Sequence, residues 1–244
     1  MTMTMVVEGL TAGYGGMDVL HDVSFTFQTG QRVAILGPNG AGKSTFQKVL
    51  GGLIRPTRGM ITLGGAVVTG DNVHKRVGRG IRWVGEPRPV YSELSVDDNL
   101  SVGGFTRNRR EREDLRVEVF DLFPALAEIR SQKAGGLSGG QQQMLAVGQA
   151  LMPSPAFLCL DEPSIGLSQA VLEKLAEVLD ALAERGTGVI WCEQFPEVAL
   201  AHCDSAALMI SGHLSEPHRP GDISSDDLHA AYLGVDPFAS AADR

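Results

Sequence analysis

Hydrophobic and polar positions alternate along three short stretches of the N-terminal part of the chain, MVVEGL, VSFTFQTG and GMITLGGAVV. Alternation with a period of two, bounded by turn residues, is typical of strands that bury one face. We therefore expect these stretches to form antiparallel strands. The run RVAILG between the second and third is continuously apolar and ends in glycine, which indicates a strand buried on both faces.

Two further apolar runs, AFLCL (156–160) and GVIWC (188–192), flank a segment with helical spacing. The apolar face of that helix is predicted to hold Val171, Leu175, Val178 and Leu182, with Glu173, Lys174, Glu177 and Asp180 on the other face. Gly186 is the expected helix stop. Because buried strands alternate with amphipathic helices, the fold class is α/β, with layers around a mainly parallel sheet.

The middle of the chain, residues 96–152, has helical patterns and no strong strand candidate. We interpret it as a helical lobe inserted into a single domain, whose α/β core is formed by residues 1–95 and 153–235. Residues 236–244 are expected to be a frayed tail. The charged stretch RNRREREDLR within the lobe is interpreted as the solvated start of a helix, and contact with a partner is the alternative.

Composition adds limits to this picture. Hydrophobic residues make up 43% and charged residues 20%, as in ordinary globular proteins, and the net charge of -8 argues against a nucleic-acid partner. Cys159 and Cys192 lie in apolar runs, Cys203 is distant, and buried thiols are expected rather than a metal site.

No uncharged apolar run approaches the about 18 residues of a membrane span, and MTMTMVVEGL lacks a secretory signal pattern. A cytosolic protein is therefore expected, reaching a membrane only through a partner.

A glycine-rich stretch, GPNGAGKST, lies between the strand RVAIL and the apolar-periodic FQKVLGGL. It matches the pattern G-x-x-x-x-G-K-[ST] between a strand and a helix, which predicts a phosphate-binding loop. Backbone N–H groups in such a loop face phosphate oxygens, the lysine reaches the β and γ phosphates, and the serine hydroxyl binds Mg²⁺. The predicted nucleotide-binding residues are Gly37, Pro38, Asn39, Gly40, Ala41, Gly42, Lys43, Ser44 and Thr45.

The run FLCLDEP ends a buried strand with two carboxylates, Asp161 and Glu162. Ligands of open α/β sheets bind at the carboxyl ends of strands. A turn residue would account for a single charge, but two carboxylates downstream of a phosphate loop fit the division of labour in phosphoryl transfer. Asp161 is expected to hold Mg²⁺, and Glu162 to orient the attacking water and accept its proton.

The stretch LSGGQQQMLAVGQAL starts another helix, in which Ser138 and Gln141 fit a capping box. Its apolar face is predicted to hold Met144, Leu145, Val147, Ala150 and Leu151. Gly139 and Gly140 each weaken the first turn by about 1 kcal/mol relative to alanine, but leave its N–H groups open to an anion. Since residues 37–44 already hold phosphates, we interpret this helix start as receiving the γ-phosphate of a nucleotide bound to another copy. This implies a dimer with ATP at the interface.

In this order and spacing, the phosphate loop, LSGGQ and FLCLDE resemble the ATP-binding cassette (ABC) family, as far as about Gly234. The resemblance implies a P-loop NTPase of ABC type, with a mainly parallel core sheet, an antiparallel β lobe and a helical lobe. It also implies a head-to-tail dimer with two ATP sites. Tyr14 in LTAGYGG would stack on adenine, and a turn aromatic that covers the sheet is the alternative.

Three positions differ from the commonest cassette pattern. Glu86 in VGEPRPVY stands where glutamine usually lies near Mg²⁺, Gln194 in CEQF stands where histidine usually contacts the γ-phosphate, and Ser168 replaces a frequent aspartate. With the late AAYLG, these features resemble the F-type ATPase subunit of branched-chain amino acid importers, although VGEPRPVY departs from the P-E-G-R pattern of that subfamily. We interpret Glu86 and Gln194 as site residues.

The resemblance implies an ATPase that uses ATP and Mg²⁺ and lies on the inner face of the cell membrane. Its expected partners are two permease subunits, a solute-binding protein and a second ABC ATPase, either related or identical. The alternatives are the ATPase of another importer, such as one for urea or amides, the ATPase of a lipid exporter, a cluster-assembly or other non-transport cassette, and a regulator without turnover. Intact Asp161 and Glu162 count against the regulator.

Overall fold

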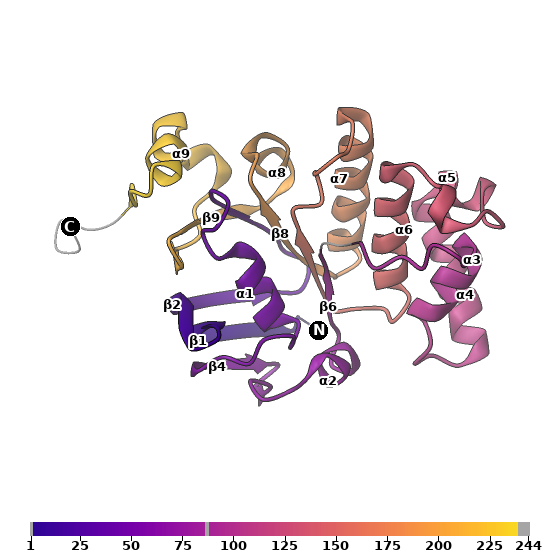
Figure 1. Cartoon of the computed structure of the whole chain (residues 1–244), viewed down its shortest axis with the longest axis horizontal. Coiled ribbons are helices and arrows are strands. Elements are labelled where there is room, and N and C mark those ends of the chain that lie inside the picture. The colour runs from indigo at the N-terminus through magenta and orange to yellow at the C-terminus, as the bar shows by residue number, and fades with distance from the viewer. Residues whose placement is uncertain (1, 86–87, 239–244) are drawn as a thin grey trace.

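Two β-sheets organise the chain in the computed structural model, which describes residues 2–85 and 88–238 (Figure 1). The antiparallel sheet has the order β2-β1-β4-β5, with β1 (Thr4–Tyr14), β2 (Met17–Gln28), β4 (Arg58–Leu63) and β5 (Ala66–Val67). The core sheet has the order β10-β9-β3-β8-β7-β6, with β3 (Arg32–Leu36), β6 (Ile81–Val84), β7 (Phe157–Asp161), β8 (Gly188–Glu193), β9 (Ser205–Ile210) and β10 (His213–Leu214). Strands β9, β3, β8, β7 and β6 run parallel, and β10 is antiparallel to β9.

The antiparallel sheet follows the alternation in the sequence. Met5 of β1 lies opposite Phe27 of β2, and both side chains are buried on the face toward the core. A two-glycine turn joins β1 to β2, and the positive φ angles of such turns match the twist of a hairpin. The stretch GMITLGGAVV, expected to be one strand, forms the hairpin of β4 and β5 because its internal pair Gly64–Gly65 turns with positive φ.

The parallel strands bring three segments to one edge of the core sheet. Every residue of β7 and β8 is buried, which confirms the strands predicted from the continuous apolar runs. Leu36 pairs with Glu193, and Asp161 pairs with Cys192, so β3, β8 and β7 end at nearly the same level. The segments that follow these strands therefore lie side by side at the carboxyl edge, where α/β sheets bind ligands.

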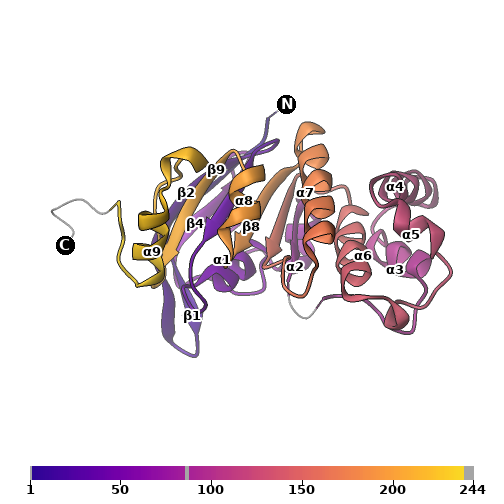
Figure 2. The ribbon, with the colours of Figure 1, turned by 90° about the horizontal axis from the view of Figure 1, so that it is seen from above.

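Helices cover the core sheet on both faces. On one face, α1 (Lys43–Leu50) lies between the two sheets, and its Phe46 ring is perpendicular to that of Phe25. On the other face lie α7 (Gln169–Glu184) and α8 (Pro196–His202) (Figure 2). Shorter elements complete the core: α2 (Val73–Gly78) beside β6, a 3₁₀ turn (Pro220–Asp222), and α9 (Ser225–Tyr232) beside β9.

Helix α7 has the predicted amphipathic pattern with two differences. Leu175, Val178 and Leu182 are buried, whereas Val171 in the first turn is only partly buried. Asp180, expected on the solvated face, is instead half-buried, because its carboxylate accepts a hydrogen bond from Arg32 and contacts the His202 ring. The helix stop is confirmed, since Gly186 follows the last turn with a φ of 95°.

Residues 96–152 form a group of helices and contain no β-strand. The group consists of α3 (Val96–Gly103), α4 (Arg109–Leu122), α5 (Pro124–Glu128), a 3₁₀ turn (Ala134–Gly136) and α6 (Gly139–Leu151). Helix α6 packs against α3, α4 and α5 and reaches β6, and the group extends beyond α7 at the side of the molecule away from the antiparallel sheet (Figures 1 and 2). All five apolar residues predicted for α6 are buried. Asn108 and Glu111 form a capping box at the start of α4, so RNRREREDLR does begin a helix.

The other expectations from composition concern thiols, membrane spans and the tail. Cys159, Cys192 and Cys203 are free and buried, as predicted, and burial raises the pKa of Cys159 and Cys203 to about 12. Among the described residues, no helix has the length and apolar character needed to cross a membrane. At the predicted tail, the Phe238 ring stacks on His218, and residues 239–244 lie outside the described part.

Candidate functional site

The segment between β3 and α1 lines a pocket of about 400 Å³ at the carboxyl edge of the core sheet. The pocket is formed by Tyr14, Val19, Asn39, Gly40, Gly42, Lys43, Ser44, Thr45 and Glu162. These residues come from the tip of the β1–β2 hairpin, the predicted phosphate loop and the end of β7. Residues far apart in the sequence thus converge on one cavity, and most of them belong to the predicted nucleotide site.

The start of α1 presents uncovered backbone donors to this pocket. Gly42 is the N-cap residue and has a φ of 113°, a left-handed conformation that other residues rarely adopt. Among the residues that the structure describes, no side chain caps this helix start. The first N–H groups of an α-helix have no partner within the helix, so this start can bind an anion such as a phosphate.

Lys43 is fixed over the loop by three contacts. Its side chain is only 3% exposed, and Nζ donates to the carbonyl oxygens of Gly37 at 2.7 Å and Pro38 at 3.1 Å. Nζ also forms an ion pair with Glu162 Oε1 at 3.0 Å. Two of the donors of this ammonium group thus hydrogen-bond to backbone carbonyls, and its charge is paired with a carboxylate. The positive charge therefore lies between the phosphate loop and the predicted catalytic carboxylate.

Ser44 and Asp161 meet beside Lys43. Ser44 Oγ donates to Asp161 Oδ1 at 3.0 Å. Burial raises the pKa of the Asp161 carboxyl, and the hydrogen bond from Ser44 opposes this effect. Mg²⁺ prefers oxygen ligands and is usually held by one or two carboxylates together with phosphate and water oxygens. A hydroxyl and a carboxylate at this separation fit such a site.

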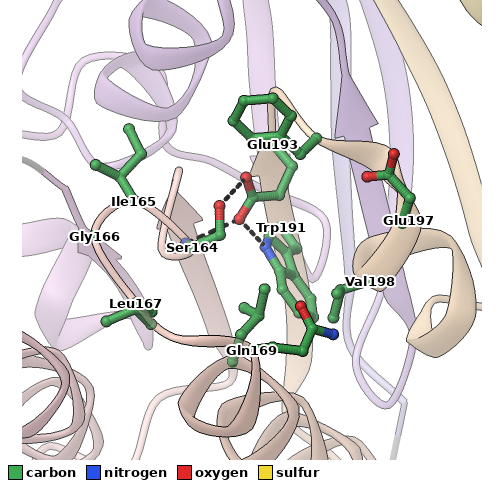
Figure 3. A pocket seen from close by; sticks show the side chains of 11 residues that line it. Ser164, Ile165, Gly166, Leu167, Gln169, Trp191, Glu193, Glu197 and Val198 are labelled. Carbon is green, nitrogen blue, oxygen red and sulfur yellow. Dashed lines mark hydrogen bonds between the residues drawn. The ribbon is translucent and has the colours of Figure 1, made fainter.

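The loop that begins at Glu162 is attached to the end of β8. Glu162 has a φ of 47°, unusual for a residue other than glycine, and its N–H donates to the Cys192 carbonyl at 2.9 Å. Glu193 is buried at the end of β8 and accepts hydrogen bonds from Ser164 and Trp191 (Figure 3). Burial raises the pKa of the Glu193 carboxyl, whereas these hydrogen bonds act to lower it.

Gln194 follows Glu193 at the end of β8 and is partly buried. Its carbonyl accepts a hydrogen bond from the Tyr232 hydroxyl of α9, and burial raises the pKa of Tyr232 to about 12. The Gln194 side chain does not line the phosphate-loop pocket. The other predicted switch residue, Glu86, lies outside the described residues.

The start of α6 has the predicted capping box. Ser138 N–H donates to Gln141 Oε1 at 2.9 Å, and Gln141 N–H donates to Ser138 Oγ at 3.3 Å. A Cβ atom on Gly140 would lie 3.0 Å from Val171 of α7, so close packing is a second reason for glycine there. Residues 138–141 do not line the phosphate-loop pocket of their own chain.

Sequence reasoning gave no role to three residues that the structure brings to this edge. Glu193 and Ser164 hold the loop after Glu162, and Arg88 bridges two segments. Arg88 Nε donates to Gln143 of α6, and Arg88 Nη2 donates to the Ile165 carbonyl, both at 2.7 Å. A charged residue at the end of an apolar strand was a sequence signal for Glu193. The partners of Arg88 and Ser164 are distant in the chain, and no local pattern indicates them.

Comparison with known proteins identifies the family. The ABC transporter family matches residues 20–165, more than half of the chain. The chain belongs to this family. This ABC ATPase is 37% identical over 223 residues to the high-affinity branched-chain amino acid transport ATP-binding protein BraG of Pseudomonas aeruginosa, covering 91% of this chain and 95% of that protein. It is 30% identical over 237 residues to the lipopolysaccharide export system ATP-binding protein LptB of Escherichia coli, covering 96% and 98%.

Solved structures agree with the fold. The ADP conformation of MJ1267, an ATP-binding cassette of an ABC transporter, superposes with a TM-score of 0.85 at 23% identity, covering 95% of this chain and 99% of that one. An ATP-binding subunit of an ABC transporter gives a TM-score of 0.81 at 26% identity, covering 93% and 98%. The predicted ABC-type α/β fold is therefore confirmed. As a member of this family, the chain is a nucleotide-binding ATPase subunit of a transporter.

Proposed function

We propose that this ABC ATPase binds Mg–ATP in the phosphate-loop pocket and energises the import of branched-chain or chemically similar amino acids. The observation that carries the proposal is the convergence of Lys43, Ser44 and Glu162 on one cavity, beside which Asp161 accepts a hydrogen bond from Ser44. The polar contacts of Ser44 with Asp161 and of Lys43 with Glu162 are both 3.0 Å long. This set contains a cation for phosphates, two oxygen ligands for Mg²⁺ and a carboxylate for water.

The phosphate loop, Gly37 to Thr45, surrounds the triphosphate with backbone N–H groups. Lys43 exchanges its contacts with the Gly37 and Pro38 carbonyls and with Glu162 for phosphate oxygens, which releases the carboxylate of Glu162. Tyr14 lies on the rim of the pocket with 47% of its surface exposed, which leaves its ring free to stack on adenine.

Different residues are assigned to binding the metal ion and to accepting the proton of the attacking water. Ser44 and Asp161 hold Mg²⁺, which neutralises phosphate charge when it is bound, and Glu86 is proposed as a further contact. Glu162 orients the attacking water and takes its proton. Gln194 donates from its neutral side-chain amide to the γ-phosphate, so this contact does not titrate near neutral pH.

A second ABC ATPase completes the nucleotide site. Ser138, Gly139, Gly140 and Gln141 do not line the pocket of their own chain, and they contact the γ-phosphate of a nucleotide bound to the partner. The partner is a related cassette or a second copy. The pair works on the inner face of the cell membrane with two permease subunits and a solute-binding protein.

The similarity to BraG, a branched-chain amino acid transport protein, supports the substrate class. The similarity to LptB, a lipopolysaccharide export protein, supports lipid export as the second candidate. Uptake of labelled leucine into cells that lack this chain distinguishes them. We expect uptake to fall and to be restored by the wild-type chain but not by Glu162→Gln, while proline uptake stays constant as a control. Unchanged uptake of leucine, isoleucine and valine would contradict amino acid import.

A further inference from the structure

A buried carboxylate at the end of β8 is not used by the chemistry described above. Glu193 is 1% exposed, and the residues that precede it in the strand, from Val189 to Cys192, are apolar. Burying an ionised carboxylate costs free energy that hydrogen bonds only partly offset, whereas an apolar side chain has no such cost. The cost points to a role for Glu193 beyond stability.

The hydrogen bonds of Glu193 connect two segments of the site. Oε1 accepts from Trp191 Nε1 at 2.9 Å and from the Ser164 N–H at 3.0 Å, and Oε2 accepts from Ser164 Oγ at 2.7 Å (Figure 3). Two of the three donors therefore belong to Ser164, two residues after Glu162. The Trp191 donor lies on the same strand as Glu193 and orients the carboxylate toward the loop.

Consecutive residues of β8 thus hold the loop at two points. The Cys192 carbonyl accepts from the Glu162 N–H, and the Glu193 carboxylate accepts from Ser164. Glu162 has a φ of 47°, and such a conformation persists only when the surrounding structure enforces it. Gln194 comes directly after Glu193, so the same anchor also fixes the segment that carries Gln194.

We propose that Glu193 is a positioning residue for ATP hydrolysis. Its carboxylate holds the Ser164 segment against β8 and thereby fixes Glu162 relative to Gln194. The inference rests on the proposed role of Glu162 as the base. Loss of a positioning residue lowers turnover more than it lowers nucleotide affinity or stability. Loss of a residue needed only for folding lowers stability first, so the two roles of Glu193 can be distinguished.

Two substitutions at Glu193 separate these roles. Glu193→Leu fills the buried space but removes all three acceptor contacts. Glu193→Gln keeps Oε1 for Trp191 and the Ser164 N–H, and its amide can donate to Ser164 Oγ. On the transporter complex purified through this chain, we expect Glu193→Leu to lower kcat on the order of a hundredfold, as small misplacements of reacting groups do, with the KM for ATP nearly unchanged. We expect Glu193→Gln to keep most of the activity.

Asp204→Asn is the matched control. The Asp204 carboxylate also accepts from a backbone N–H and a side chain, both of Arg32, but at the opposite end of the core sheet. We expect Asp204→Asn to lower the melting temperature and leave kcat unchanged. Ser164→Ala, which removes one of the contacts, should lower kcat modestly, and should lower it no further in combination with Glu193→Leu.

Three results would overturn the inference: wild-type kcat in Glu193→Leu, a fall in kcat that only follows the loss of stability as in Asp204→Asn, or a similar fall in Glu193→Gln. Should Glu193→Leu not fold, wild-type kcat in Ser164→Ala overturns the inference and a lower kcat at constant KM supports it. The variant Glu162→Gln tests the proposed role of Glu162 as the base separately from the role of Glu193. If that variant still hydrolyses ATP, the role of Glu162 is wrong whatever Glu193 does.

Discussion

Glu162 is held by backbone hydrogen bonds to Cys192 and Ile165 and by the ion pair of its side chain with Lys43. Glutamine at this position keeps the shape and can still accept from Lys43, but it cannot take up a proton. We therefore expect Glu162→Gln to bind ATP with nearly normal affinity and to release phosphate at least about 100-fold more slowly. Nucleotide-binding fluorescence and phosphate release measure the two effects. Glu184→Gln, an exposed position on α7, is the control, and unchanged turnover in Glu162→Gln would exclude Glu162 as the base.

Glu193 also gives a prediction for stability against pH. Because burial raises its pKa, the folded protein binds this proton more readily than the unfolded chain, whose glutamate pKa is about 4.3. Ionisation of Glu193 at higher pH therefore destabilises the fold, and the free energy of unfolding rises as the pH falls toward 4.3. Burial also raises the pKa of Asp161, so its ionisation affects stability in the same direction. In urea unfolding at pH 7 and pH 5, Glu193→Gln should show a smaller rise than the wild type, and an equal rise would contradict the shift.

At the scale of elements, the start of α6 combines a structural and a functional role. Ser138 caps α6, and Ser95 caps α3 in the same group of helices by accepting from Asp98 N–H. Loss of either cap is expected to lower the free energy of unfolding by about 1 kcal/mol. Only Ser138→Ala should also lower ATP turnover of the assembled transporter, because only that hydroxyl is proposed to meet the partner's nucleotide. Equal turnover in Ser138→Ala and Ser95→Ala would show that Ser138 is a cap alone.

The elements themselves were largely predictable from the sequence. The apolar runs of β7 and β8 and the periodicity of α6 and α7 are local signals, and the structure has these elements within one or two residues of the expected ends. The hairpin of β4 and β5 was missed because the alternation continues through its glycine turn. Fold and phosphate loop thus follow from local patterns.

The unpredicted features depend on contacts between distant segments. Arg88 meets Ile165, Asp180 meets Arg32, and Gly140 meets Val171, and each pair is brought together only by the tertiary packing. Glu193 was visible as a charge at the end of an apolar strand, but its partner Ser164 lies 29 residues away. Local patterns cannot supply such pairs, so the network around Glu162 required the structure.

At the scale of the whole molecule, the nucleotide pocket and the start of α6 belong to different parts of the chain. The pocket lies at the edge of the core sheet, and α6 belongs to the group of helices beyond α7 (Figures 1 and 2). Arg88 connects α6 to the loop after Glu162, so movement of the helices can reach the carboxylate proposed as the base through this contact. We therefore propose that a partner cassette supplies the γ-phosphate contacts assigned to the start of α6.

The most direct test of this account is the structure of the Glu162→Gln transporter saturated with Mg–ATP, purified with its natural partner. We expect each triphosphate between Lys43 of one cassette and the capped start of α6, Ser138 to Gln141, or its counterpart, on the other. A structure in which Mg–ATP occupies the phosphate loop while the start of α6 lies away from every nucleotide would contradict the account.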